Sequence, residues 1–176
     1  LDRFTIRNLE LVYSVQEGGV PLIQLMDQTQ TPMGARLLRK WMVLPLKDMK
    51  AIQDRQDGVA GLLASDDLLD QMSALLKPVG DLERLISKVA AGRINPRELL
   101  QLKRALQQIP GIQALLGQQK SDFLKKASDQ LNPCQRLVDK IDTALRDDAP
   151  MLIHQGGIIK TGFLAELDEL HVLSSN

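Results

Sequence analysis

Residues 31–46 read TPMGARLLRKWMVLPL, a stretch that is typical of a helix delimited at both ends. Thr31 is a favourable N-cap, Pro32 suits the first helical position, and Pro45 cannot continue the turn. The stretch therefore predicts an amphipathic helix, because its apolar residues recur at helical spacing. Three side chains of its apolar face are expected in the core: Leu37, Leu38 and Trp41.

Polar residues mark further helix starts along residues 31–149. Asn95 carries the clearest signature, because Pro96 follows it and Glu98 stands where its carboxylate can reach back to the Asn95 amide. The expected caps are Thr31, Asp48, Asn95 and Asn132. The helical face after Asn95 adds three expected core residues, Leu99, Leu102 and Leu106. Residues 31–149 are therefore predicted to form a helical body.

The two ends of the chain carry weaker helical patterns. Residues 1–30 show two short apolar runs around Glu17-Gly18-Gly19, which predicts a small β-hairpin. Near residues 151–160, short apolar pieces flank two glycines, which predicts a short extended turn. Residues 163–173 return to a helical pattern. The expected fold class is mainly α, an irregular multi-helix bundle with these two small decorations.

Composition supports one helical domain over residues 1–176. The chain is 44% hydrophobic but only 3% aromatic, which suits helices packed on helices. Twenty-two basic residues balance 22 acidic ones, so no net positive field indicates nucleic-acid binding. No apolar run approaches the roughly 18 residues that a membrane span requires. We therefore expect a cytoplasmic protein with no membrane partner.

Patterns that carry catalytic or metal chemistry point to no site. A two-glycine spacing ends at Gly162, but Phe163 and Leu164 replace the lysine and hydroxyl residue of a P-loop. Cys134 is the single cysteine, and the two histidines stand far apart in sequence. We expect no catalytic residue, no cofactor-binding residue and no metal ligand.

Basic residues on two predicted helices are the candidates for contacts with a DNA backbone. These candidates are Arg36, Arg39, Lys40, Arg97 and Arg104. Each cluster occupies the polar side of a helix whose other side is apolar. The preferred interpretation is therefore a solvated helix face.

Several blocks of the sequence closely resemble the MutS family of DNA mismatch-repair proteins, in the order that the family has them. Besides residues 31–46, the blocks include RNLEL at 7–11, DLER at 81–84, PREL at 96–99 and ELDEL at 166–170. The resemblance covers nearly the whole chain. It is closest to the core, or lever, domain of the family.

The resemblance implies a parent protein that is a dimeric, ATP-driven clamp on DNA. In the family, an N-terminal domain reads mismatches through a Phe-x-Glu motif, and a C-terminal P-loop domain binds ATP and Mg. Phe4, Phe123 and Phe163 lack the glutamate two places on, so no mismatch-reading or ATPase residue is carried over. The chain starts without methionine and ends after an amphipathic run, so we expect a segment that lacks the mismatch-reading, clamp and ATPase domains.

By resemblance, residues 1–30 form the entry, 31–149 the helical body, and 150–176 a turn and the start of a lever helix. The implied role is to link mismatch recognition and the clamp to the ATPase and to transmit conformational change. Implied partners are mismatched duplex DNA through other domains, neighbouring MutS domains, a second subunit and downstream repair factors, on the chromosome. Alternatives are an interaction module, including that of a recombination-type paralogue, and a hydrolase built from scattered carboxylates.

Overall fold

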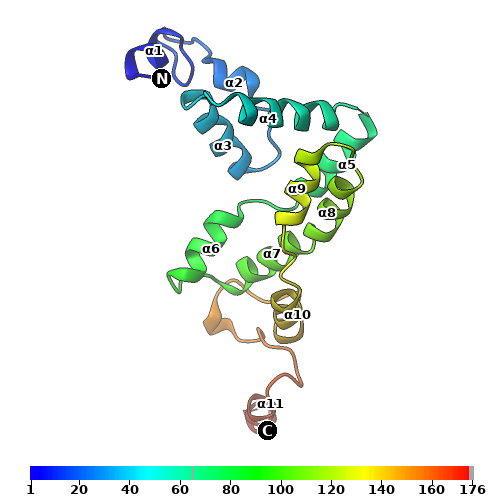
Figure 1. The fold of residues 1–176 in the computed structure, drawn as a ribbon. Coiled ribbons are helices and arrows are strands. Elements are labelled where there is room, and N and C mark those ends of the chain that lie inside the picture. Colours follow the sequence, from blue (N-terminus) through cyan, green and yellow to red (C-terminus); the bar gives the residue numbers. More distant parts are fainter. Residues whose placement is uncertain (65, 175–176) are drawn as a thin grey trace. The chain divides into compact units, whose positions relative to one another are not determined.

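The computed structural model describes residues 1–64 and 66–174, which are mainly helical (Figure 1). In chain order the elements are α1 (Arg3–Asn8), α2 (Leu22–Met26), α3 (Pro32–Val43), α4 (Met49–Leu62), α5 (Asp66–Leu76), α6 (Leu82–Ala90), α7 (Pro96–Leu106), α8 (Ile109–Gly117), α9 (Asp122–Gln130), α10 (Gln135–Ala144), the 3-10 helix η1 (Ile153–Gln155) and α11 (Ala165–Ser174). The mainly helical fold class predicted from composition is confirmed.

The contacts divide the chain into two compact units. Unit 1 comprises Leu1–Asp81 and Pro110–Leu131. Unit 2 comprises Leu82–Ile109 and Asn132–Asn176. Each unit is therefore assembled from two separate segments of the sequence.

Unit 1 is held together where α4 lies against α9. Two glycines of α4 permit this close approach. A Cβ added at Gly58 would lie 2.5 Å from Phe123 Cδ1, and one at Gly61 would lie 2.9 Å from Leu124 Cδ1. The Phe123 ring and the Leu124 side chain of α9 thus occupy the space that a larger residue at either glycine of α4 would need.

Unit 2 is built around α7, which contacts both α6 and α10 (Figure 1). One buried cluster joins the three helices through Leu85, Leu102, Leu106 and Val138. A second cluster comprises Leu100, Ile141, Leu145 and Ala149. Helix α7 therefore buries apolar side chains toward two neighbours at once, whereas Leu99 is partly buried and packs against both clusters.

The predicted hairpin over residues 1–30 is wrong, because the chain forms α1 and α2 there. Asp2 nucleates α1 by accepting a 2.7 Å hydrogen bond from the Thr5 amide. Glu10 then adopts a φ of 47°, and its carboxylate accepts from the Val15 amide at 3.0 Å. Local side-chain to backbone bonds thus override the weak alternation of apolar residues.

The predicted extended turn near residues 151–160 is also corrected. Its first half forms η1 and not an extended piece. Ile159, in the second half, forms an isolated antiparallel bridge with Leu145. The extended segment thus pairs with the chain just after α10, because Gly156 and Gly157 at positive φ turn it back.

The burial expected on α3 is not observed for two of its three residues. Leu37 remains 46% exposed and Trp41 40% exposed, whereas Leu38 is half-buried. The reason is that the described residues of unit 1 do not cover this face with apolar side chains. Instead, the guanidinium of Arg55 stacks on the Trp41 ring, with Cζ 3.6 Å from the ring centroid.

Three side chains that the sequence places at N-caps accept hydrogen bonds from helix amides. Thr31 Oγ1 accepts from Gly34 N at 3.1 Å, and Asp48 Oδ1 from Ala51 N at 2.7 Å. Asn95 Oδ1 accepts from Glu98 N at 3.0 Å, as described further below.

The prediction for Asn132 is wrong. Its Oδ1 accepts from the Cys134 amide at 2.8 Å, which closes a turn before the helix. Cys134 then takes a left-handed conformation with φ 50°, so that α10 begins only at Gln135. A residue that bonds two places ahead closes an Asx turn and no longer caps the helix.

Candidate functional site

Helix α7 starts at a reciprocal capping box, which fixes its position in unit 2. Asn95 Oδ1 accepts from the Glu98 amide at 3.0 Å, and Glu98 Oε2 accepts from the Asn95 amide at 3.2 Å. The other oxygen of Glu98 binds Lys88 of α6. The Lys88 ammonium and the Asn95 amide hold the pKa of Glu98 below its ordinary value. The first turn of α7 is therefore tied to α6 by charge as well as by packing.

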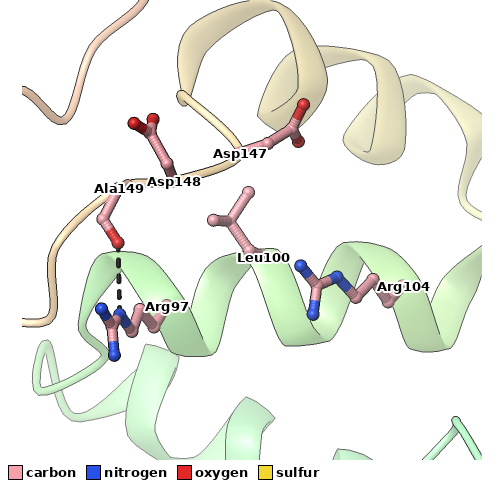
Figure 2. Close-up of a pocket in the computed structure, with 6 residues that line it drawn as sticks. All are labelled: Arg97, Leu100, Arg104, Asp147, Asp148 and Ala149. Atoms are coloured by element: carbon pink, nitrogen blue, oxygen red, sulfur yellow. Dashed lines mark hydrogen bonds between the residues drawn. The ribbon is translucent and has the colours of Figure 1, made fainter.

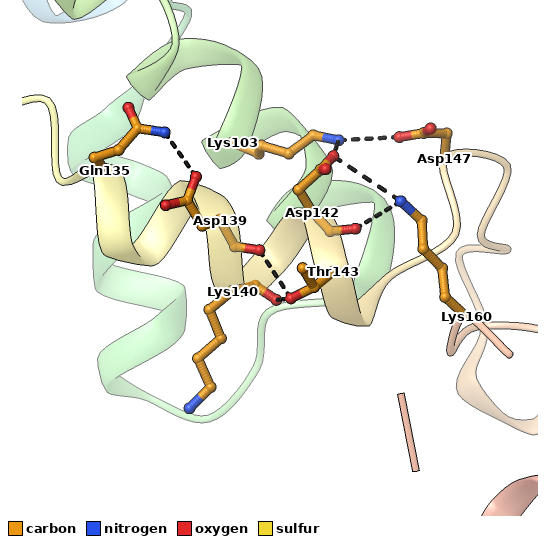
Figure 3. A network of polar contacts seen from close by, with 8 residues as sticks. All are labelled: Lys103, Gln135, Asp139, Lys140, Asp142, Thr143, Asp147 and Lys160. Carbon is orange, nitrogen blue, oxygen red and sulfur yellow. Dashed lines mark hydrogen bonds and ion pairs between the residues drawn. The ribbon is translucent and has the colours of Figure 1, made fainter. Parts of the chain in front are cut away.

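Lys103 forms the centre of a cluster of charges on α7 (Figure 3). Its side chain is only 7% exposed, and its Nζ donates 2.9 Å hydrogen bonds to Asp142 Oδ1 and to Asp147 Oδ1. Lys160 Nζ donates to the backbone oxygen of Asp142 at 2.6 Å and lies 4.0 Å from Asp142 Oδ1. We refer to Lys103, Asp142, Asp147 and Lys160 as the Lys103 cluster. Its members come from α7, α10 and the chain that follows α10.

The charges of the Lys103 cluster stabilise one another. Hydrogen bonds to Asp142 and Asp147 raise the pKa of Lys103, although burial acts in the opposite direction. The same ammonium lowers the pKa of Asp142 and of Asp147. At neutral pH all three groups are therefore ionised. The two carboxylates thus offset the desolvation of a lysine whose side chain is largely withdrawn from water.

Residues 145–160, which we call the strap, lie against α7 and α10. Backbone bonds close the strap on itself and on the end of α10, from Arg146 N to Ile158 O and from Lys160 N to Ala144 O, both 2.9 Å. Leu145 is buried in the cluster with Leu100, against which Ile158 and Ile159 pack. The strap thus combines a short backbone pairing with an apolar underside.

A small pocket lies where the strap passes over α7 (Figure 2). Its volume is about 270 Å³, and its lining residues are Arg97, Leu100, Arg104, Asp147, Asp148 and Ala149. Arg97 Nε donates to the Ala149 carbonyl at 3.3 Å. Asp148 binds Arg146 through two hydrogen bonds of 3.0 and 2.9 Å. The pocket is rimmed by charges above a floor of Leu100 and Ala149, which are almost fully buried.

The structure separates the five candidates for DNA contacts into two groups. Arg97 and Arg104 line the same pocket of unit 2, and both are exposed. Arg36, Arg39 and Lys40 lie on α3 in unit 1. Arg36 forms a bidentate pair with Asp81 at 2.9 and 2.7 Å, and the Arg39 guanidinium lies 5.7 Å from the Tyr13 ring centroid. Two of the α3 candidates are thus engaged within unit 1.

Sequence reasoning missed the Lys103 cluster. Neither Lys103 nor Asp147 is among the candidates that the sequence patterns indicate. A signal was nevertheless present, because Lys103 falls four residues after Leu99 and three before Leu106, on the buried stripe. No pattern in the sequence indicates that Asp142 and Asp147 meet this lysine, since the packing of α10 on α7 places Asp142 and the strap places Asp147.

Neither metal chemistry nor a membrane span is indicated in the part of the chain that the structure describes. Residues 1–64 and 66–174 contain no group of three or more His, Cys, Asp or Glu side chains placed to hold a metal ion. Within the same residues, no helix is both long and apolar enough to cross a membrane. The buried clusters and the ion pairs of Lys88 and Lys103 join the helices of unit 2 to one another, as in a helical structural domain.

Comparison with known proteins identifies the family. Residues 4–174 match the family model of MutS domain III, and the chain belongs to this family. The DNA mismatch repair protein MutS of Cytophaga hutchinsonii is 56% identical over 99% of this chain and 20% of its own length. The proteins of the same name from Bacteroides fragilis and Flavobacterium johnsoniae are 46% and 43% identical over 99% and 100% of this chain, again over 20% of their own lengths.

The chain therefore spans about a fifth of the length of the curated relatives it matches. The matched region is domain III and not the ATPase domain, and no catalytic activity is indicated for it. The resemblance seen in the sequence blocks is thus confirmed at the level of family and domain.

Proposed function

We propose that residues 1–176 serve as one core or lever domain, which links the mismatch-recognition and clamp regions of a mismatch-repair protein to its ATPase. The observation that carries the proposal is the Lys103 cluster, which fastens the strap to α7 and α10. The strap leads within a few residues into α11, so a force on α11 acts on α7 through these contacts. Such an arrangement suits a transmitter of conformational change.

Charge pairs suit this role because their geometry is discrete. Lys103 binds Asp142 of α10 and Asp147 of the strap, so release of the strap would leave its buried side chain with one of its two carboxylates. A strap held in this way has two arrangements, attached and released. Coupling follows if mismatched DNA favours one arrangement and ATP favours the other.

The wider setting is proposed from what resemblance to the family implies. Mismatched duplex DNA would be bound through other domains of the parent protein, and ATP and Mg through its ATPase domain. The parent would act as a homodimer on the chromosome in the cytoplasm and would recruit downstream repair factors. The exposed apolar face of α3, with Leu37, Trp41 and Leu44, supports contacts with neighbouring domains.

The test uses the full-length mismatch-repair protein that carries this chain, with Lys103→Met. Lys140→Met is the matched control, because Lys140 is an exposed lysine of α10 whose ammonium lies apart from the cluster (Figure 3). We expect Lys103→Met to reduce the stimulation of ATP turnover by mismatched DNA, with basal turnover retained. Lys140→Met should leave both rates unchanged. Equal stimulation in both variants would contradict the proposal.

The exposed α3 face also favours a second function, that of a protein-interaction module, for which the sequence leaves a recombination-type paralogue as the alternative parent. Under that alternative, substitutions on this face would abolish capture of a partner protein. They would leave any response to mismatched DNA intact. The two functions therefore predict opposite outcomes for the same variants.

A further inference from the structure

The pocket between α7 and the strap has a charge imbalance that the packing of unit 2 does not explain. Asp147 is bound by Lys103, and Asp148 is bound by Arg146. Across the described residues, by contrast, no carboxylate lies within ion-pair distance of Arg97 or Arg104. The two guanidinium groups are exposed, so the pocket offers cationic donors whose charge is not neutralised.

The spacing of the two arginines suggests what could neutralise them. Arg97 and Arg104 are seven residues apart on one helix, so they lie on the same face, separated by about 10 Å along the axis (Figure 2). Carboxylates seven residues apart on another helix have the same separation. A guanidinium binds a carboxylate through two parallel hydrogen bonds, which makes such pairs geometrically specific.

The carboxylates at the rim favour a discrete partner over a nucleic acid. The side chains of Asp147 and Asp148 are 72% and 71% exposed beside the arginines. Duplex DNA carries one negative charge per about 1.7 Å of its axis, so its backbone would approach these aspartates as well. A protein helix can place two acidic groups on the arginines and leave uncharged side chains opposite the aspartates.

We propose that the Arg97 and Arg104 pocket is a docking site for an acidic helical segment of a partner protein, with two carboxylates seven residues apart. One carboxylate binds each guanidinium, and the intervening turn lies over the pocket. Arg97 already donates to the Ala149 carbonyl, so its guanidinium is held in place before the partner arrives. This inference does not depend on the transmitter role, because its test measures peptide binding and not ATP turnover.

The experiment measures binding of a fluorescently labelled helical peptide to the 176-residue chain by anisotropy. The probe is an alanine-rich helix longer than about 15 residues that carries two glutamates seven residues apart. Control peptides carry the glutamates four residues apart, or glutamines in their place. We expect saturable binding of the first peptide only, and weaker binding at higher salt concentration.

Variants of the chain locate the binding. Arg104→Gln should weaken binding about tenfold, as expected for the loss of one charge-assisted pair. Arg136→Gln is the matched control, because it removes an exposed arginine of α10 outside the pocket and should leave binding unchanged. Thermal unfolding of both variants should match that of the unsubstituted chain, since Arg104 makes no ion pair among the described residues.

Three results would overturn the proposal. The first is an absence of saturable binding, or equal binding of the glutamate and glutamine peptides. The second is equal weakening by Arg104→Gln and Arg136→Gln, which would indicate general charge attraction. The third is selective loss of duplex DNA binding, or of self-association of the chain, in Arg104→Gln without any effect on the peptide.

Discussion

Helices α3 and α7 begin in the same way and end in different environments. Each starts with a polar N-cap followed by proline, and in each the capping side chain accepts from the third helical amide. Yet α7 buries Leu100, Leu102 and Leu106, whereas α3 has no fully buried residue. The comparison teaches that caps are local and depend only on nearby residues, whereas burial depends on whether another element covers the face.

The two helices also use their basic residues differently. On α7, Lys103 is buried and binds two aspartates from other segments of unit 2. On α3, Arg36 and Arg39 remain at the surface, where they meet Asp81 and the ring of Tyr13. A basic residue on a helix is thus a packing element or a surface group according to the position it occupies relative to the apolar stripe.

The largest difference is expected when one leucine of each helix is truncated. Leu102→Ala should lower the free energy of unfolding by about 2–5 kcal/mol, because it leaves a cavity in the core of unit 2. Leu37→Ala should lower it by less than about 1 kcal/mol, because Leu37 is already largely in water. Urea denaturation of both variants measures the difference. Similar losses at the two sites would break the comparison between buried α7 and exposed α3.

The caps provide a control in which the two helices should behave alike. Asn95→Ala and Thr31→Ala should each reduce stability by about 1 kcal/mol, since each removes one acceptor from a helix N-terminus. The reciprocal bond, in which the Asn95 backbone amide donates to Glu98, remains in Asn95→Ala because the substitution retains that amide. It therefore adds nothing to the stability lost in Asn95→Ala. The same denaturation measurement applies. A loss at Asn95 several times that at Thr31 would show that the caps depend on burial as well.

Lys103→Met should have a small effect on overall stability. Methionine retains the buried stem, and Asp142 and Asp147 are exposed enough to be solvated by water. The free energy of unfolding should therefore change by less than about 1 kcal/mol. Faster amide exchange should appear at Arg146 and Lys160, whose amides hold the strap. Unchanged exchange at these two amides would show that packing alone retains the strap.

The smallest effect concerns pH. Because Lys103 lowers the pKa of Asp142 and Asp147, the stability they provide is present above the ordinary aspartate value of 3.8 and is lost as the pH falls below it. Thermal unfolding of the unsubstituted chain should thus decline more steeply below about pH 4 than that of Lys103→Met. Parallel declines in the two proteins would indicate that Lys103 does not lower the pKa values of the two aspartates in the folded state.

Much of the helical framework could be predicted from the sequence because its determinants are local. The caps at Thr31, Asp48 and Asn95 are each read from a few consecutive residues. The structure of residues 1–30 could not be predicted in this way, because the side-chain hydrogen bonds of Asp2 and Glu10 compete with a weak alternation of apolar residues. The prediction of Asn132 as a helix cap was wrong for a related reason, since an asparagine side chain can either cap a helix or close a turn.

The candidate site depended on contacts that no local pattern records. Lys103 lies 39 residues from Asp142 and 44 from Asp147, and only the packing of α10 on α7 and the path of the strap bring the three together. Its position on the apolar stripe was a usable signal for burial, but not for its partners. The exposed face of α3 illustrates the converse, because an amphipathic pattern predicts a buried face without showing that the covering element belongs to the same chain.

The central claim is that the Lys103 cluster couples the strap to the helix pair in response to DNA. Hydrogen exchange of the strap in the full-length protein tests it most directly, with matched and mismatched duplexes bound in turn. We predict that the amides of Arg146 and Lys160 exchange at different rates with the two duplexes, and that Lys103→Met abolishes this difference. The same exchange with both duplexes in the unsubstituted protein would contradict the account.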